Sequence, residues 1–288
     1  MFNFYVDAYA DMFGTELEQK GLLLAPSKIV EGKKIIDFSG YKDENDVLLY
    51  VQKIQQHKLS VQPLNSDEWY DFFSPVLDSG QDVIFFSVSF GMLGDKGLAL
   101  KSAFAKLNKN YPTRKAILVD THTVSRGTSE IASLARIVYN KNQDIDEALD
   151  FADTIIGKFV SVFALDNVDT LKKNALLSPI AKSFSGATLN LKPIVCIDTE
   201  GKFKLLDKAK GYKSALSKLY SNVKENGLNV ADYTFSIVSF NADTEAKELY
   251  DRFRKILTEH EIRLVKMSPN NAIFTGDKIV ALTFHSKY

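Results

Sequence analysis

Short apolar runs alternate with amphipathic stretches in the first half of the chain. Runs such as Asp82–Ser87 have the length and continuous apolar character of strands that are buried on both faces. Between them, apolar residues recur every three or four positions, as in helices that cover a sheet. The expected strands are Phe2–Val6, Lys34–Phe38, Asp82–Ser87 and Ala116–Asp120, and the expected helices are Glu44–Gln56, a helix capped by Ser66, Gly97–Leu107, Ser129–Tyr139 and Asp146–Phe159. This alternation predicts an α/β fold with a parallel sheet covered on both faces.

The pattern changes after about residue 160, where strands begin to follow one another more closely. Two expected strands, Pro193–Asp198 and Lys202–Leu206, flank Thr199-Glu200-Gly201, which predicts a hairpin with glycine at a turn position. The other expected elements are the strands Ser161–Leu165, Tyr233–Phe240, Arg263–Met267 and Ile279–Phe284 and the helices Val168–Lys173, Lys213–Glu225 and Thr244–Glu259. We therefore predict two α/β domains, with a parallel sheet in residues 1–160 and a mixed sheet in residues 161–288.

The charge balance argues against one class of protein, the dedicated nucleic-acid binders. The 288 residues contain 36 Lys plus Arg and 36 Asp plus Glu, whereas a dedicated nucleic-acid binder normally carries a basic surplus. The 20 Phe and 12 Tyr suit either a core or an apolar pocket. No run is long enough to span a bilayer, and the first residues do not resemble a signal peptide, so we expect a cytoplasmic protein.

Cysteine and histidine give little sign of metal or redox chemistry. Cys196 is the one cysteine and lies in an apolar strand, so we expect a core thiol and no nucleophile. None of His57, His122, His260 and His285 is spaced from another His or Cys as metal ligands are, so no metal or other cofactor is expected. His122 follows a strand end, where ligands gather in α/β sheets, and is a candidate to line a site.

Ser89 raises one alternative function. The segment Ser87-x-Ser89-x-Gly91 follows a strand and differs by one residue from the Gly-x-Ser-x-Gly of a nucleophile elbow. An acyl hydrolase using Ser89 would take Asp198 or Asp232 and His260 or His285 as triad partners. The elbow needs a helix directly after the serine, and the glycine-rich segment 91–97 predicts no helix there. The hydrolase is therefore the less favoured function.

Two further polar features follow strand ends. The segment Gly91-x-x-Gly94-x-x-Gly97 is typical of an anion-holding loop, but it matches no nucleotide motif, and Asp95 would repel a phosphate. Asp7 and Asp120 follow strands that we expect to end at one edge of the sheet. They are candidates for paired carboxylates, although aspartate at a strand end more often caps the next turn.

Six short motifs, in order along nearly the whole chain, resemble those of the DegV family of bacterial fatty-acid-binding proteins, which have the EDD fold. The closest is Gly186-Ala187-Thr188-Leu189-Asn190-Leu191-Lys192-Pro193-Ile194, which is similar to the family's Gly-x-x-Leu-x-x-Lys-Pro-Ile. The others are Tyr5-Val6-Asp7-Ala8-Tyr9-Ala10-Asp11-Met12, Leu59-Ser60-Val61-Gln62-Pro63, Ser89-Phe90-Gly91-Met92-Leu93-Gly94-Asp95, Val119-Asp120-Thr121 with Ser125-x-Gly127, and Asp169-Thr170-Leu171-Lys172-Lys173.

The resemblance implies a non-enzymatic lipid-binding protein of two α/β domains, with one long-chain fatty acid or related lipid in a tunnel between them. It also implies a partner, a fatty acid kinase subunit that phosphorylates the carboxyl group of the bound acid. An interaction module that has lost ligand binding is a third alternative, beside the hydrolase.

This sequence departs from the family at the positions that hold the carboxylate. Ser60 stands for a family threonine, Leu93 for a serine and Phe274 for a histidine, while Asn174-Ala175-Leu176 replaces Gly-Gly-Arg. We therefore expect a degenerate carboxylate site, with Arg126 as a candidate replacement cation. The candidate ligand-binding residues are Ser60, Gln62, Ser89, Phe90, Leu93, Arg126 and Phe274.

Overall fold

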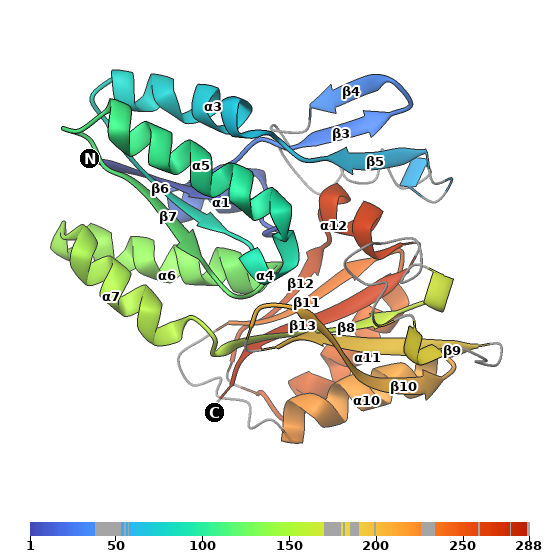
Figure 1. Cartoon of the computed structure of the whole chain (residues 1–288). Helices are drawn as coiled ribbons and strands as arrows, with labels where there is room; N and C mark the ends of the chain where they lie inside the picture. Colours follow the sequence, from blue (N-terminus) through green and yellow to red (C-terminus); the bar gives the residue numbers. More distant parts are fainter. Residues whose placement is uncertain are drawn as a thin grey trace.

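The structure is a computed structural model that describes residues 1–37, 53–54, 56, 58–169, 180, 182–184, 190–198, 200–225, 234–258, 260–276 and 278–286 (Figure 1). Most of the helix expected at Glu44–Gln56 lies outside these residues, as do most of Val168–Lys173 and the segment Asn174–Leu176. His57 and Asp232 also lie outside them. Within the described part of the chain, the strands form three sheets.

The first sheet is parallel and has the strand order β2-β1-β6-β7. The expected strands Phe2–Val6, Asp82–Ser87 and Ala116–Asp120 all lie in this sheet, which confirms the predicted parallel sheet. Helices α3 and α5 cover one face of this sheet, and α6 and α7 cover the other (Figure 1). The bounds are β1 Phe2–Val6, α1 Gly14–Lys20, β2 Leu22–Leu24, α3 Ser66–Asp78, β6 Asp82–Ser87, α5 Asp95–Asn110, β7 Ala116–Asp120, α6 Arg126–Asn142 and α7 Ile145–Ile155.

The second sheet is mixed and has the order β10-β9-β8-β13-β11-β12. Only β11 and β12 pair in parallel, and the other neighbours are antiparallel. This arrangement confirms the expected mixed sheet, including the hairpin of β9 and β10. The bounds are β8 Phe159–Leu165, β9 Leu191–Ile197, β10 Phe203–Lys210, α10 Tyr212–Glu225, β11 Phe235–Phe240, α11 Asp243–Arg254, β12 Ile262–Lys266, α12 Pro269–Thr275 and β13 Ile279–His285.

The third sheet was not predicted, although one of its strands was expected at Lys34–Phe38. It is antiparallel, and its order is β4 (Lys34–Asp37), β3 (Lys28–Glu31), β5 (Leu59–Gln62). The other two strands, β3 and β5, have four residues each, which is too short for a period-two pattern to be distinguished from a loop. The sheet stands apart from the first one, and β5 contacts α12 from the other end of the chain (Figure 1).

Several helix ends differ from the expected ones for local reasons. Helix α3 is capped by Asn65, not Ser66: the Asn65 side chain accepts the Glu68 N–H at 2.9 Å, and the Glu68 carboxylate accepts the Asn65 N–H at 2.9 Å. Helix α7 ends at Ile155, because Gly157 turns the chain with a φ of 84° and Phe159 already pairs in β8.

One apolar cluster joins the two halves of the molecule. It contains Val88 and Met92 from the first half and Phe163, Val238 and Met267 from the second. The other clusters lie under the helices that cover each sheet. The chain passes from the first sheet to the second between α7 and β8, and we propose a domain boundary there, at about residue 160.

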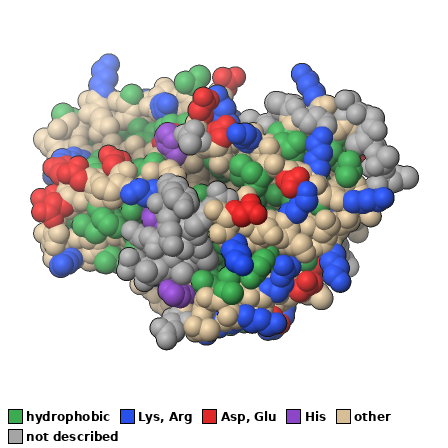
Figure 2. Space-filling view, turned by 90° about the horizontal axis from the view of Figure 1, so that it is seen from below, with side chains coloured by type: hydrophobic (Ala, Val, Ile, Leu, Met, Phe, Trp, Pro, Cys, Tyr) green, Lys and Arg blue, Asp and Glu red, His purple; other side chains and the backbone are tan. Residues whose placement is uncertain are grey.

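Charged side chains of both signs lie on the face of the molecule seen from below (Figure 2). Figure 2 shows Lys and Arg side chains interspersed with Asp and Glu on the face seen from below. Neither sign forms a continuous patch among the described residues on that face, in keeping with a net charge of zero.

Candidate ligand-binding cavity

A cavity lies at the carboxyl edge of the parallel sheet. Its empty volume is about 810 Å³ when the open solvent at its mouth is included. The lining is mostly apolar. It consists of Asp7, Ala8 and Tyr9 after β1, Pro26, Ser27 and Lys28 before and in β3, Val61, Gln62, Pro63 and Leu64 in and after β5, Trp69 in α3, Val88, Met92, Leu93, Lys96 and Leu100 after β6, and Asn271 and Phe274 in α12.

Strand ends and tertiary contacts together form this cavity. The loops after β1 and β6 are held side by side, with the Asp7 N–H donating to the Phe86 carbonyl at 3.1 Å. Helix α12 is fixed against the first loop, because the Asn271 side-chain amide donates to the Tyr9 carbonyl at 2.8 Å. The carboxyl edge of a parallel sheet is where ligands bind in α/β folds.

The cavity adjoins the apolar cluster that joins the two halves. Val88 and Met92 belong to both, and Tyr9, Leu93 and Phe274 pack against the same cluster. The apolar lining of the cavity is therefore continuous with the apolar cluster between the two halves.

Three of the seven candidate ligand-binding residues line the cavity: Gln62, Leu93 and Phe274. Leu93 ends the short helix α4 (Phe90–Leu93). Phe274 lies in α12, and its ring stacks on Phe203 of β10 with centroids 5.6 Å apart. Ser60 is exposed on β5 and does not line the cavity, although its neighbours Val61 and Gln62 do.

Ser89 and Phe90 have structural roles outside the cavity. Ser89 is fully buried and caps α4, its hydroxyl accepting the Gly91 N–H at 3.1 Å. The expectation of no helix after Ser89 is wrong, because this serine supplies the cap that a four-residue helix needs. The Phe90 N–H donates to the Asp120 carboxylate at 3.2 Å, and its ring contacts Lys101 and packs in the cluster between the sheet and α3 and α5.

The surroundings of Ser89 do not resemble a nucleophile elbow. Its backbone is unstrained, with φ −49° and ψ 129°, and Gly201 of the β9–β10 hairpin packs directly on its hydroxyl. Ser89 makes no hydrogen bond to a histidine among the described residues. His285 instead contacts the Phe159 ring edge-on, and the Asp198 carboxylate accepts N–H groups of its own hairpin.

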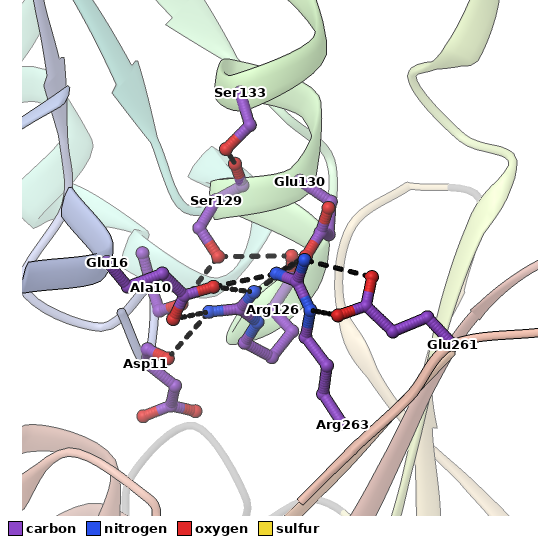
Figure 3. Close-up of polar contacts among 9 residues, drawn as sticks. All are labelled: Ala10, Asp11, Glu16, Arg126, Ser129, Glu130, Ser133, Glu261 and Arg263. Atoms are coloured by element: carbon purple, nitrogen blue, oxygen red, sulfur yellow. Dashed lines mark hydrogen bonds and ion pairs between the residues drawn. The ribbon is translucent and has the colours of Figure 1, made fainter. Parts of the chain in front are cut away.

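Arg126 does not lie in the ligand site, where the sequence analysis expected a replacement cation. It is completely buried, and its guanidinium donates to Glu16 at 2.9 and 2.7 Å and to Glu130 at 2.7 Å (Figure 3). Arg263 of β12 also pairs with Glu16, at 2.8 Å, so the network links the two halves. Burial by itself lowers the pKa of Arg126, but the two carboxylates outweigh it and the net shift is upward. Arg126 is therefore neutralised by protein groups and does not line the cavity.

The strand-end aspartates cap turns and do not pair with each other. Asp120 accepts the His122 N–H at 3.0 Å, and Asp7 accepts the Tyr9 N–H at 3.1 Å. Asp7 nevertheless lines the cavity. Burial raises the pKa of its carboxyl group to about 6, and hydrogen bonds from Tyr9, Val88 and Ser87 moderate the shift. His122 is half exposed and does not line the cavity.

Sequence reasoning missed several lining residues, among them Trp69, Lys96 and Asn271. Trp69 lies on the apolar face of α3, and such a face gives no hint of a cavity. Asn271 has no sequence signal, because only folding brings α12 to the first half. Among the described residues no cluster of side chains could hold a metal ion, and no helix is long and apolar enough to cross a membrane.

Comparisons with known proteins agree with this architecture. The DegV domain-containing protein YteA of Lactococcus lactis is 21% identical over 284 residues, which cover 98% of this chain and 96% of that protein. The crystal structure of the fatty acid binding DegV family protein SAG1342 from Streptococcus agalactiae superposes with a TM-score of 0.82 at 20% identity and covers 100% of this chain and 99% of that one. The Fatty Acid Kinase (Fak) B3 protein of Streptococcus pneumoniae, loaded with linoleic acid, gives a TM-score of 0.80 at 15% identity, with 100% of both chains covered.

The family model is the decisive comparison, because it covers almost every residue. The model described as uncharacterised protein of the DegV family matches residues 3–287. The chain belongs to the DegV family.

Proposed function

We propose that this protein binds a long-chain fatty acid or a related acyl lipid and carries out no reaction on it. The observation that carries the proposal is the apolar cavity at the sheet edge, which adjoins the apolar cluster between the two halves. Each buried methylene contributes roughly 0.8 kcal/mol, so a sixteen-carbon chain gains on the order of 10 kcal/mol before the costs of association. This gain does not require a polar side chain that binds the head group.

The relatives support the same ligand class. SAG1342 is named for fatty acid binding, and the Fak B3 protein was crystallised with linoleic acid. At 15–20% identity these structures establish a shared fold for this chain. The apolar cavity is the feature of this chain itself that suits an acyl lipid.

The carboxylate site of the family is proposed to be degenerate here. Leu93 and Phe274 both line the cavity, so both apolar replacements face the same space. Burying a carboxylate without a partner costs several kcal/mol or forces it to take up a proton. We expect that an ionised head group does not lie beside these two side chains.

The buried state of Ser89 argues against the acyl hydrolase, since a nucleophile must be reached by substrate. A fluorophosphonate probe tests this point: we expect no labelling above background, whereas stoichiometric labelling lost in Ser89→Ala would establish the hydrolase. Presentation of the acyl group to a fatty acid kinase subunit stays a prediction, as does a cytoplasmic location.

The direct test is native mass spectrometry of the purified protein, followed by lipid extraction and titration with palmitate and 1-hexadecanol. We expect one bound acyl chain per protein. Leu93→Trp places a large ring in the cavity and is expected to weaken both ligands at least tenfold, because the acyl chain loses its space. Leu98→Trp is the matched control, since Leu98 is 62% exposed on α5 and does not line the cavity. Absence of any bound or titratable lipid would contradict the proposal.

A further inference from the structure

Three lining residues of the cavity are exposed: Gln62, Pro63 and Lys96. The others are buried or half-buried. These three therefore mark the mouth of the cavity, and Lys96 is the charged residue among them.

Lys96 is unpaired in the described part of the chain. The other lysine of the lining, Lys28, forms an ion pair with Glu68, whereas Lys96 has no ion pair or hydrogen bond with a described residue. Lys96 also lies in the first turn of α5, where the helix dipole disfavours a cation and favours an anion. The neighbouring Asp95 is exposed, forms no ion pair with Lys96 and does not line the cavity.

The interior of the cavity contains a carboxyl group and apolar side chains, whereas the mouth carries a cation. Asp7 is 7% exposed, and with its pKa at about 6 the carboxyl group is mostly ionised at neutral pH. Its negative charge repels an anion that enters deeply. Leu93 and Phe274 offer no hydrogen bond to a head group and suit a methylene chain.

We propose that the acyl chain lies inward and that its anionic head group stays at the mouth, paired with Lys96. The proposal rests on the lipid binding proposed above and narrows the ligand class to single-chain amphiphiles with a carboxylate or phosphate head group. Because the head group meets solvent, a phosphate is accommodated as well as a carboxylate.

The test measures the affinities of palmitate, hexadecyl phosphate and uncharged 1-hexadecanol for the full chain and for Lys96→Gln and Lys96→Glu. Partly exposed ion pairs are modest in strength, so we expect Lys96→Gln to weaken both anions about two- to fivefold, with a larger loss for Lys96→Glu. The affinity for 1-hexadecanol stays unchanged. Raising the salt concentration should reduce the anion affinity of the wild type more than that of Lys96→Gln.

Lys109→Gln is the matched control. Lys109 is exposed on the same helix, about 20 Å along its axis from Lys96. This variant removes the same charge and is expected to leave all three affinities unchanged.

The outcomes separate the two proposals. If none of the three probes binds to the wild type, lipid binding itself is wrong. If palmitate binds and Lys96→Gln leaves its affinity unchanged, or weakens 1-hexadecanol equally, the head group does not pair with Lys96. Binding of palmitate with complete exclusion of hexadecyl phosphate would indicate an enclosed carboxylate site and would also overturn the inference.

Discussion

Leu93 at the end of α4 and Phe274 in α12 line the same cavity, although they come from distant parts of the sequence. Because both side chains line one cavity, the two replacements together make a single site less polar. A polar pair at these positions would line the same cavity.

The double variant Leu93→Ser with Phe274→His is therefore expected to bind palmitate more tightly than the wild type. Hydrogen bonds to a charged group contribute about 1.5–3 kcal/mol, so a gain of tenfold or more is expected. The gain should be larger at pH 6 than at pH 8, because the histidine is then more often protonated.

Isothermal titration at the two pH values measures this gain. The Lys96→Gln substitution provides an internal check, because its effect should shrink in the double variant once the head group has a site inside. An unchanged affinity in the double variant would show that these positions do not meet the head group.

Asp7→Asn is expected to stabilise the protein at neutral pH. Because burial raises the pKa of Asp7 to about 6, the folded protein holds this proton more tightly than the unfolded chain does. The ionised carboxylate therefore lowers stability progressively from about pH 4 to pH 6, and the loss is complete above that range.

The measurement is the free energy of unfolding of wild type and Asp7→Asn between pH 4 and pH 8. The advantage of the variant should be small at pH 4 and reach about 3 kcal/mol by pH 7. Any loss from replacing the carboxylate by an amide as the acceptor of the Tyr9 N–H is subtracted from this gain. A constant difference across the range would mean that the Asp7 carboxyl group has an ordinary pKa.

Arg126→Met is expected to destabilise the fold by about 3–5 kcal/mol, because it leaves Glu130 buried and without its close cation. Arg114→Met is the control: Arg114 is partly exposed and lies 3.9 Å from Asp82, so we expect a loss below about 1 kcal/mol.

Urea denaturation gives both values. The palmitate affinity of folded Arg126→Met should equal that of the wild type, since Arg126 does not line the cavity. A selective loss of palmitate binding would instead show that Arg126 pairs with the carboxylate of the ligand.

Gly201→Ala is expected to destabilise by more than about 2 kcal/mol, through strain at a left-handed backbone position and a steric clash. A Cβ at residue 201, where φ is 72°, would lie 1.8 Å from the Ser89 hydroxyl oxygen. Gly157→Ala is the control for the backbone strain alone, because φ is 84° there and no atom lies within 4 Å of the added Cβ.

Thermal unfolding of the two variants separates these effects. Adding Ser89→Gly to Gly201→Ala should recover part of the loss, since it removes the atoms that clash. Equal losses in Gly201→Ala and Gly157→Ala would mean that the hairpin does not pack on Ser89.

The sequence by itself determined most strands of the two main sheets, although not the three-residue strand β2. Continuous apolar runs such as Asp82–Ser87 are buried on both faces whatever their neighbours are, so their pattern is sufficient to identify them. The same holds for the amphipathic helices, apart from ends set by local caps such as Asn65. The order of motifs also determined the family.

The tertiary structure decided the site. Gln62, Leu93 and Phe274 meet in one cavity only because β5 and α12 pack over the carboxyl edge of the first sheet. Arg126 carries the same charge in the sequence as Lys96, yet folding buries Arg126 between two carboxylates and leaves Lys96 at the cavity mouth. A residue type specifies what a side chain is able to bind, but its partners and its exposure, which the fold sets, decide whether that capacity is still available to a ligand.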